Sequence, residues 1–373
     1  MSDTFHVNPH SIPPAARNHH LIVDMQENKI ISDDGKQRQP AEQWAEFTDE
    51  NVLAELPPGT RSLGNFLHGA SFWSRNARIE TEQADGSQKS FFIKLTSASI
   101  GEATVAGEFA SMTALHQIVP HSTPRPIAHG TYASNPSIHF FLCDFIDMID
   151  ELPDIRTFTY KIAQLHSTSE SPNGKYGYST PTYLGRLAQH TAWTSSWEVF
   201  FTNYMKHLMS SIESVQDPDQ EFRSLFDAIV ELVIPRLMRP LETGGRSIRP
   251  CLVHGDLYAG NVSVDEAALE PIVYDATCLY AHNESKYWTI AIDGSEGDLA
   301  QRGLLRHKIG RPYMKAYFRQ FPISEPEEDL EDRNALYILS LEAMRALLAK
   351  FPGGYESWAR ERGKDPAPRP EAW

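Results

Sequence analysis

The stretch of sequence that decides the fold of this chain reads Leu252-Val253-His254-Gly255-Asp256-Leu257-Tyr258-Ala259-Gly260-Asn261-Val262-Ser263-Val264, followed after a polar turn by Pro271-Ile272-Val273-Tyr274-Asp275. Its first apolar segment predicts a strand that runs into His-Gly-Asp, and the two apolar segments after Asn261 predict a short hairpin. A hairpin centred on Ala268 would set Asn261 and Asp275 opposite each other, at its open end beside Asp256.

This set of side chains suits phosphoryl transfer, in which the protein positions the reactants and neutralises charge. Asp275 is a hard carboxylate that could bridge Mg²⁺ to phosphates, and Asn261 could give a neutral oxygen to a second metal ion. Asp256 could accept the proton of an incoming hydroxyl. The spacing Asp-x₄-Asn with a later aspartate resembles the catalytic loop and metal-binding aspartate of kinases. A lone His-Gly-Asp is a common turn, so the prediction depends on the whole set.

Lys94 is the second anchor of the predicted site, because it interrupts the apolar strand 91–95. Lysine is rarely buried unless it is paired. Glu108, on the predicted helix that follows, is the favoured partner, and Glu102 is the other candidate. In kinases a strand lysine contacts the nucleotide phosphates and is held by a helix glutamate. The alternative is an edge-strand lysine whose ammonium reaches water.

The expected phosphate loop has a weak signature, because no G-x-G-x-x-G occurs between Gly64 and Trp73. Backbone amides near Gly69 and Ser71 could still cradle a phosphate. Cys143, in the predicted strand 138–143, is the remaining candidate for nucleotide contact.

The pattern along the chain predicts an α+β protein with a β-rich amino-terminal lobe and a larger, mainly helical carboxyl-terminal lobe. The first lobe is predicted to contain a short helix after Asp49, one helix over 105–115 and a hairpin turn at Asp85-Gly86. Its predicted strands are 66–73, 77–80, 91–95 and 138–143. Helices near 158–165, 197–208, 222–233 and 336–348 form the second lobe. We assign 1–47 to a polar extension, 48–147 and 148–359 to the two lobes, and 360–373 to a loose tail.

The composition of the chain indicates which classes of partner and which compartment are expected. Lys and Arg number 34 against 49 Asp and Glu, a formal charge of −15 that disfavours nucleic acid. No run of about 18 apolar residues occurs, and the amino-terminal residues lack the features of a secretory signal. Three cysteines, Cys143, Cys251 and Cys278, are too few for a disulfide framework and indicate a reducing, cytoplasmic compartment.

Over about 56–356 the residues resemble the fructosamine-3-kinase (ketosamine-3-kinase) family, relatives of the aminoglycoside and choline kinases with a protein-kinase-like, two-lobed fold. The His-Gly-Asp loop is shared by many small-molecule kinases. The tryptophan-rich segment 176–201 and the run Tyr280-Ala281-His282-Asn283-Glu284 narrow the choice to this family. Two departures are Lys286, where the family usually has a carboxylate, and a loop at 69–73 that lacks the usual Gly-Gly pair.

The resemblance implies ATP- and Mg²⁺-dependent phosphorylation of the sugar 3-hydroxyl of a ketoamine, such as a ribulosamine or fructosamine adduct. The resulting phosphoester is unstable and releases the amine, which amounts to deglycation. It also implies roles for the site: Asp256 as the base, Asn261 and Asp275 as metal ligands, and Lys94 as the phosphate contact.

Three further residues are candidates for substrate contact. His282 and Glu284 lie in a polar loop after Asp275, where sugar hydroxyls would need donors and acceptors, although they could instead tie the loop to the helical lobe. Trp193 could lay its ring against a sugar or be a core residue. Two other functions stay open: another small-molecule kinase of the aminoglycoside or choline type, and a nucleotide-binding pseudokinase, which the intact Lys94 and Asp256 disfavour.

Overall fold

The computed structural model describes residues 47–366 apart from 70–73, 98–99, 150, 216–219, 287–308 and 310, together with Pro370. The chain divides into two units, 1–43 and 44–373, and all that follows concerns the second. The predicted extension 1–47 therefore lies almost wholly outside the described residues, and so does Ser71 of the predicted phosphate loop.

The first part of this unit is an antiparallel sheet of five strands in the order β1-β2-β3-β5-β4. The strands are β1 (Arg61–Leu67), β2 (Ser74–Glu82), β3 (Gln88–Ser97), β4 (Pro126–Thr131) and β5 (Ile138–Asp144). The predicted hairpin turn between β2 and β3 is confirmed, with Gly86 at φ +81°. Strand β4 was not predicted from the sequence, because it opens with a proline; proline is tolerated at the start of an edge strand.

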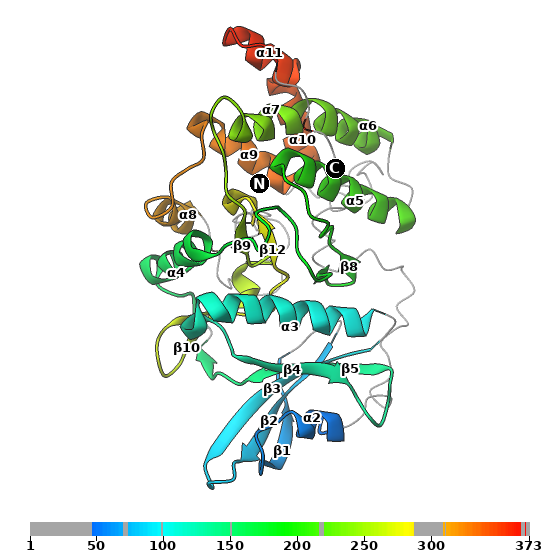
Figure 1. Ribbon diagram of the computed structural model, residues 1–373, viewed down its shortest axis with the longest axis vertical. Helices are drawn as coiled ribbons and strands as arrows, with labels where there is room; N and C mark the ends of the chain where they lie inside the picture. The colour runs from blue at the N-terminus through cyan, green and yellow to red at the C-terminus, as the bar shows by residue number, and fades with distance from the viewer. Residues whose placement is uncertain are drawn as a thin grey trace, which may run out of the picture. The chain divides into compact units, whose positions relative to one another are not determined.

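Two helices accompany the sheet. The predicted helix after Asp49 is confirmed as α2 (Glu50–Ala54), with the Asp49 carboxylate accepting from the backbone N–H of Asn51. Helix α3 (Gly101–Ile118) buries Val105, Met112 and Leu115 at helical spacing. In Figure 1 α3 crosses between the sheet and the helical part of the unit. The helix is therefore placed where its side chains can contact both parts.

The second part is mainly helical, which confirms the α+β class. Its described helices are α4 (Ile155–Thr168), α5 (Trp197–Val215), α6 (Gln220–Ala228), the π-helical turn η4 (Ile229–Val233), α7 (Ile234–Met238), η5 (Arg239–Glu242), α8 (Arg311–Tyr317), η9 (Glu327–Asp329), α9 (Leu330–Ile338), α10 (Leu341–Lys350) and α11 (Gly354–Glu361). None of these described helices is long and apolar enough to cross a membrane.

Three small sheets carry the loops of interest. Strand β10 (Val262–Asp265) pairs with β11 (Pro271–Val273) and with β6 (Met148–Ile149). Strand β9 (Cys251–Val253) pairs with β12 (Leu279–Ala281), and β7 (Tyr183–Leu184) pairs with β8 (Leu187–Ala188). Short 3₁₀ turns, η3 (Pro120–Ser122), η6 (Ala259–Asn261) and η7 (Asn283–Lys286), complete the described elements.

Two sequence expectations about the carboxyl-terminal region are wrong. The single helix expected over 336–348 is two helices, because Leu339 adopts a left-handed backbone (φ +43°) between α9 and α10. The apolar spacing continues through this break, which is why periodicity alone missed it. The tail expected from Arg360 is wrong at its first two residues, because Arg360 and Glu361 belong to α11.

Helix α10 depends on a side-chain cap at this break, since the Ser340 hydroxyl accepts from the backbone N–H of Ala343 at 3.1 Å. Replacing Ser340→Ala is expected to lower the free energy of unfolding by about 1 kcal/mol. Ser340→Asp keeps a capping oxygen and should stay near the parent protein. Thermal melts of both variants test this, and equal losses in the two would show that the cap contributes nothing.

Candidate active site

The loop after β9 is held by the imidazole of His254, which is buried. Its Nε2 lies 3.0 Å from the carbonyl oxygen of Tyr274, and its Nδ1 lies 3.3 Å from the backbone nitrogen of Asp256. A carbonyl only accepts, so Nε2 carries the proton and Nδ1 accepts the N–H of Asp256. The sequence alone assigned no role to His254. Its signal was a polar residue closing an apolar strand directly before a glycine.

Gly255 is a position where only glycine fits. Its φ is +89°, and an added Cβ would collide with the carbonyl oxygen of Thr277. The backbone N–H of Thr277 in turn donates to the carbonyl of His254 at 2.9 Å. The loop that carries Asp256 and the segment that follows Asp275 therefore pack against each other, backbone to backbone.

The hairpin predicted from the sequence is confirmed, but its register is one residue from the expected one. Val262 pairs with Val273, so Asn261 lies opposite Tyr274 rather than Asp275, and the Tyr274 N–H donates to the Asn261 carbonyl. Asp275 is the next residue and has a left-handed backbone with φ +59°. Such a conformation costs a non-glycine residue about 1–3 kcal/mol and is typical of functional sites.

Asn261 and Asp256 contact each other directly. The amide nitrogen of Asn261 lies 3.1 Å from an Asp256 carboxylate oxygen and 2.9 Å from its carbonyl oxygen. These two contacts use the amide's donors, so the side-chain oxygen of Asn261 is the atom left to act as an acceptor. Asn261 is buried, so its side chain has little freedom to move and holds the Asp256 carboxylate in one orientation.

Lys94 joins the two parts of the unit. Its ammonium lies 2.7 and 2.9 Å from the Glu108 carboxylate oxygens and 2.6 Å from an oxygen of Asp275. The side chains of Lys94 and Glu108 are 11 % and 8 % exposed, whereas that of Asp275 is 51 % exposed. The predicted pairing of Lys94 with Glu108 is confirmed over the alternative Glu102, which is exposed.

The charges in this cluster do not balance. Burial raises the pKa of Glu108 to about 7, with Lys94 opposing the rise and the charge of Asp275 adding to it. Burial also acts to raise the pKa of Asp275, but the Lys94 ammonium outweighs it and holds the pKa below its usual value. Burial would lower the pKa of Lys94, yet Asp275 and Glu108 raise it, so the lysine stays charged.

One ammonium therefore faces two carboxylates, with Asp256 nearby as a further anion, and the site favours an additional cation. The candidate ligands are the half-exposed Asp275 carboxylate and the Asn261 amide oxygen, which are hard oxygen ligands of the kind that Mg²⁺ prefers. Among the described residues no group of three or more His, Cys, Asp or Glu forms a metal cage. Mg²⁺ commonly uses one or two carboxylates plus phosphates and water, so the residues fit it.

The other residues predicted to contact the nucleotide are Gly69, Ser71 and Cys143. Gly69 is exposed, with φ +73° and open space around an added Cβ, and Ser71 lies outside the described residues. Cys143 is buried on β5 opposite Phe92, where burial and the nearby Glu108 charge raise its pKa, so the thiol is neutral. Aromatic rings also gather close by, with His68 centred 4.9 Å from Phe145 and 6.2 Å from Phe92.

His282 and Glu284 are fully buried, so the expectation of direct substrate contact gives way to the alternative. The His282 ring nitrogens bond to Tyr337 and Ser324 hydroxyls at 2.9 Å each. Glu284 accepts two bonds from Arg333 at 2.7 and 3.1 Å, and both side chains are 0 % exposed. Burial lowers the pKa of His282 to about 4, so its ring is neutral. The pair ties the loop after Asp275 to the segment 324–337.

Trp193 is half-buried rather than in the core. Its ring centroid lies 6.0 Å from that of Tyr280, and Tyr280 lies 6.1 Å from Tyr178. Trp193 thus remains a candidate for contact with an apolar sugar face.

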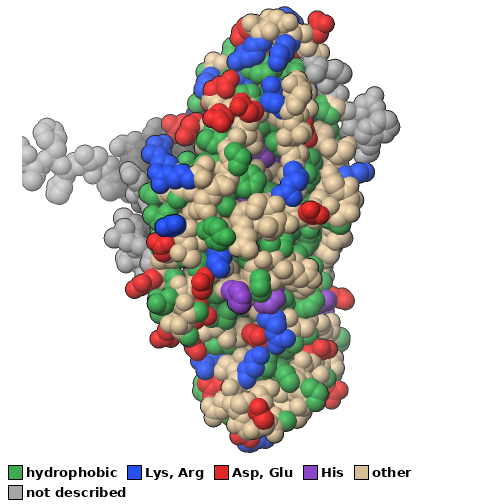
Figure 2. Space-filling view, turned by 60° about the vertical axis from the view of Figure 1, so that its left-hand side comes forward, with side chains coloured by type: hydrophobic (Ala, Val, Ile, Leu, Met, Phe, Trp, Pro, Cys, Tyr) green, Lys and Arg blue, Asp and Glu red, His purple; other side chains and the backbone are tan. Residues whose placement is uncertain are grey.

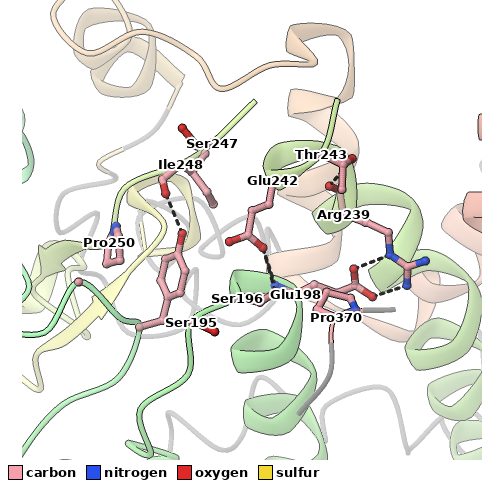
Figure 3. Close-up of a pocket in the computed structure, with 12 residues that line it drawn as sticks. Ser195, Ser196, Glu198, Arg239, Glu242, Thr243, Ser247, Ile248, Pro250 and Pro370 are labelled. Atoms are coloured by element: carbon pink, nitrogen blue, oxygen red, sulfur yellow. Dashed lines mark hydrogen bonds and ion pairs between the residues drawn. The ribbon is translucent and has the colours of Figure 1, made fainter. Parts of the chain in front are cut away.

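A separate pocket of about 390 Å³ lies where α5 begins. Figure 3 shows Glu242 directed at this helix start, where its carboxylate accepts from the N–H of Trp197 at 2.9 and 3.0 Å, with the Arg239–Glu198 ion pair beside it. Neither Lys94 nor Asp275 lines this pocket, so it is distinct from the site described above.

The buried Glu284–Arg333 pair yields a test of its structural role. Glu284→Gln would leave the Arg333 guanidinium buried without a counter-charge, which should cost about 3–5 kcal/mol. The same change at Glu356, in the exposed pair with Arg360 (67 % and 69 % exposed), is the matched control and should change little.

Thermal melts of the two variants provide the measurement. A Glu284→Gln protein that melts like the parent but has lost acceptor binding would contradict the structural role and restore substrate contact.

Comparison with known proteins agrees with this geometry. The sequence model of the fructosamine kinase family matches residues 77–362. A protein-ribulosamine 3-kinase, chloroplastic, of Oryza sativa subsp. indica is 26 % identical over 250 residues, which are 67 % of this chain and 65 % of the relative. The match therefore spans a little less than two thirds of that relative's length. Ketosamine-3-kinase of Mus musculus is 26 % identical over 228 residues, covering 55 % of this chain and 70 % of the mouse protein.

Two crystal structures show the same fold. They are of bacterial proteins that carry the provisional name fructosamine-3-kinase, from Haemophilus somnus (TM-score 0.54, 18 % identity, covering 77 % of this chain and 92 % of that one) and Thermobifida fusca (TM-score 0.54, 18 % identity, 78 % and 95 %). The fold is thus protein-kinase-like, as predicted. The family match covers most of the chain, and the protein belongs to the fructosamine kinase family.

Proposed function

We propose that this protein is an ATP- and Mg²⁺-dependent phosphotransferase that acts on the sugar 3-hydroxyl of a ketoamine. The observation that carries the proposal is the Lys94 ammonium held between Glu108 and Asp275, with the fixed Asp256–Asn261 pair on the adjoining loop. Membership of the fructosamine kinase family, and relatives named as ribulosamine and ketosamine kinases, support the choice of acceptor.

The nucleotide would bind against the sheet. The Lys94 ammonium, held in place by Glu108, would donate to phosphate oxygens in place of its bond to Asp275, and the backbone near Gly69 would approach the phosphates closely. The rings of His68, Phe92 and Phe145 offer a surface on which a base could stack. Asp275 and Asn261 would hold Mg²⁺, which when bound neutralises charge on the transferring phosphoryl group.

Asp256 would act as the base. Its carboxylate takes the proton of the acceptor hydroxyl while the hydroxyl oxygen bonds to the γ-phosphorus, the bond from that phosphorus to the β,γ-bridging oxygen breaks, and ADP leaves with the electron pair. The contact with Asn261 keeps the carboxylate aimed, and the His254–Asp256 contact fixes the loop backbone. Positioning of this kind supplies much of the rate in a reaction with little covalent chemistry.

Trp193 is the residue proposed to contact the sugar acceptor, because its partly exposed ring could cover the apolar face of a sugar. Breakdown of the 3-phosphoester would then free the amine. The cytoplasm is the proposed location, which fits three cysteines that are free and buried.

Nucleic acid is not expected as a partner. The net charge of −15 supports this. On the face shown in Figure 2 basic and acidic side chains are interspersed, and no basic stripe runs across that face.

The first test measures ADP release with Mg²⁺-ATP against ribulosamine, fructosamine, choline and an aminoglycoside. Turnover of a ketoamine is expected, and Asp256→Asn should lower kcat by roughly 10²–10⁴-fold because the proton acceptor is lost. Asp265→Asn, at the exposed turn of the same hairpin, is the control and should retain turnover.

Each result of this panel has a defined meaning. Turnover of choline or the aminoglycoside alone would keep the phosphotransferase and overturn the ketoamine acceptor. ATP binding without turnover of any acceptor would favour a pseudokinase.

A second test concerns Lys94. Lys94→Met is expected to lower kcat/KM for ATP by about tenfold or more, because the phosphates lose a charged donor and Glu108 and Asp275 lose their shared counter-charge. Lys89→Met, on the same strand in an ion pair with Asp144 at 2.8 Å, is the matched control. Equal effects of the two changes on kcat/KM for ATP would argue against a phosphate contact at Lys94.

A further inference from the structure

Residues 176–194, which we call the bridging segment, run between α3 and the segment that follows Asp275. The segment contains the small hairpin β7–β8, whose strand β7 lies against α3 (Figure 1). Its contacts on both sides suggest a role in holding these two elements together.

The contacts with α3 lie next to Glu108. An added Cβ on Gly107 would collide with the carbonyl oxygen of Pro181 and lie 3.3 Å from Cα of Thr182, so the backbone of the bridging segment lies directly on the helix. The Tyr178 hydroxyl donates to the carbonyl of Ala110 at 3.1 Å. These contacts flank the glutamate that holds Lys94.

On its other side the bridging segment contacts residues that come shortly after Asp275 in the chain. The buried Gln189 amide donates to the carbonyl of Thr277 at 2.9 Å. A carbonyl accepts only, so the NH₂ group must face Thr277, and the amide oxygen accepts from the Tyr204 hydroxyl at 3.0 Å. Gly177 and Tyr280 also exchange two backbone hydrogen bonds, at 3.0 and 2.8 Å.

Helix α3 is bonded to the same stretch directly. The N–H of Cys278 donates to the hydroxyl of Ser111 at 2.9 Å, and that hydroxyl donates to the carbonyl of Gly107 at 2.8 Å. Ser111 lies one turn after Glu108, and Cys278 lies three residues after Asp275. The two carboxylates that share Lys94 thus sit on backbones joined by buried hydrogen bonds that include none of the charged groups.

We propose that the bridging segment is a positioning clamp for the proposed phosphotransfer reaction, with Gln189 as its positioning residue. Through Gly107 and Thr277 it fixes the backbones of Glu108 and Asp275 relative to each other, so that Lys94 and the metal ligand are in place before Mg²⁺-ATP arrives. The inference rests on the proposed function for its nucleotide and metal. A site held in this way avoids the loss of rate that follows a small misplacement of its groups.

The test compares Gln189→Leu with Tyr204→Phe. Both remove the hydrogen bond between Tyr204 and Gln189, but only the first also removes the amide donors to Thr277 and to the Thr182 hydroxyl. We expect Gln189→Leu to raise the Kd for Mg²⁺-ATP, measured by calorimetry, and the Mg²⁺ concentration for half-maximal turnover, each by about tenfold, in line with the cost of misplacing site groups. Tyr204→Phe should leave both values within about twofold of the parent, because the Thr277 contact remains.

Two further variants keep the test decisive if Gln189→Leu folds poorly. Gln189→Glu keeps an acceptor for Tyr204 but offers Thr277 no donor, and Gly107→Ala pushes on the clamp from the α3 side. Both should reproduce the weaker Mg²⁺-ATP binding with the acceptor KM unchanged.

The clamp and the proposed function can fail separately. Unchanged Mg²⁺-ATP binding in Gln189→Leu and Gly107→Ala, or a change in acceptor KM alone, would overturn the clamp and make the segment part of the acceptor site. Mg²⁺-ATP binding that weakens as expected in a protein that phosphorylates no ketoamine would uphold the clamp and overturn the acceptor.

Discussion

The ammonium of Lys94 is almost fully buried, and it comes from the central region of the sheet, where a lone charge could not remain. Glu108 from α3 and Asp275 from the loop after β11 both bond to it, so a single cation joins the sheet, its helix and the helical part of the unit. The charge left over on this cluster is negative. That imbalance is the physical reason why the site suits a divalent cation and a nucleotide held around it.

Hydrogen bonds and close backbone packing around this cluster hold Glu108 and Asp275 in position beside Lys94. His254 and Gly255 pack the Asp256 loop against Thr277, and Ser111 bonds to Cys278. The loop that continues from there is tied down by the buried Glu284–Arg333 pair. This support on each side of Asp275 is what allows its left-handed backbone to persist, with the carboxylate bonded to Lys94.

The predictions from sequence succeeded where a residue's role follows from its own neighbours. Lys94 breaks an apolar strand, which favoured a buried, paired lysine over one that reaches water, and Glu108 lies at helical spacing from the apolar residues of α3. The hairpin after Asn261 followed from two apolar segments around a polar turn. Its predicted register was one residue off, because the apolar pattern shows which segments pair but does not fix which residues lie opposite each other at the end of the hairpin. The helix break at Leu339 was missed, since apolar spacing continues across it.

What the sequence by itself determined is the class of fold and the candidate residues of the site: Asp256, Asn261 and Asp275 on one loop and hairpin, and a strand lysine that pairs with a helix glutamate. Only the tertiary structure decided which polar residues face the site and which hold it. From the sequence His282 and Glu284 could either contact substrate or tie their loop to the helical part, and the structure buries both against Tyr337 and Arg333. Gln189 carries no sequence signal, because a hydrogen bond to the carbonyl of Thr277, far away in the chain, exists only once the fold has brought the two together.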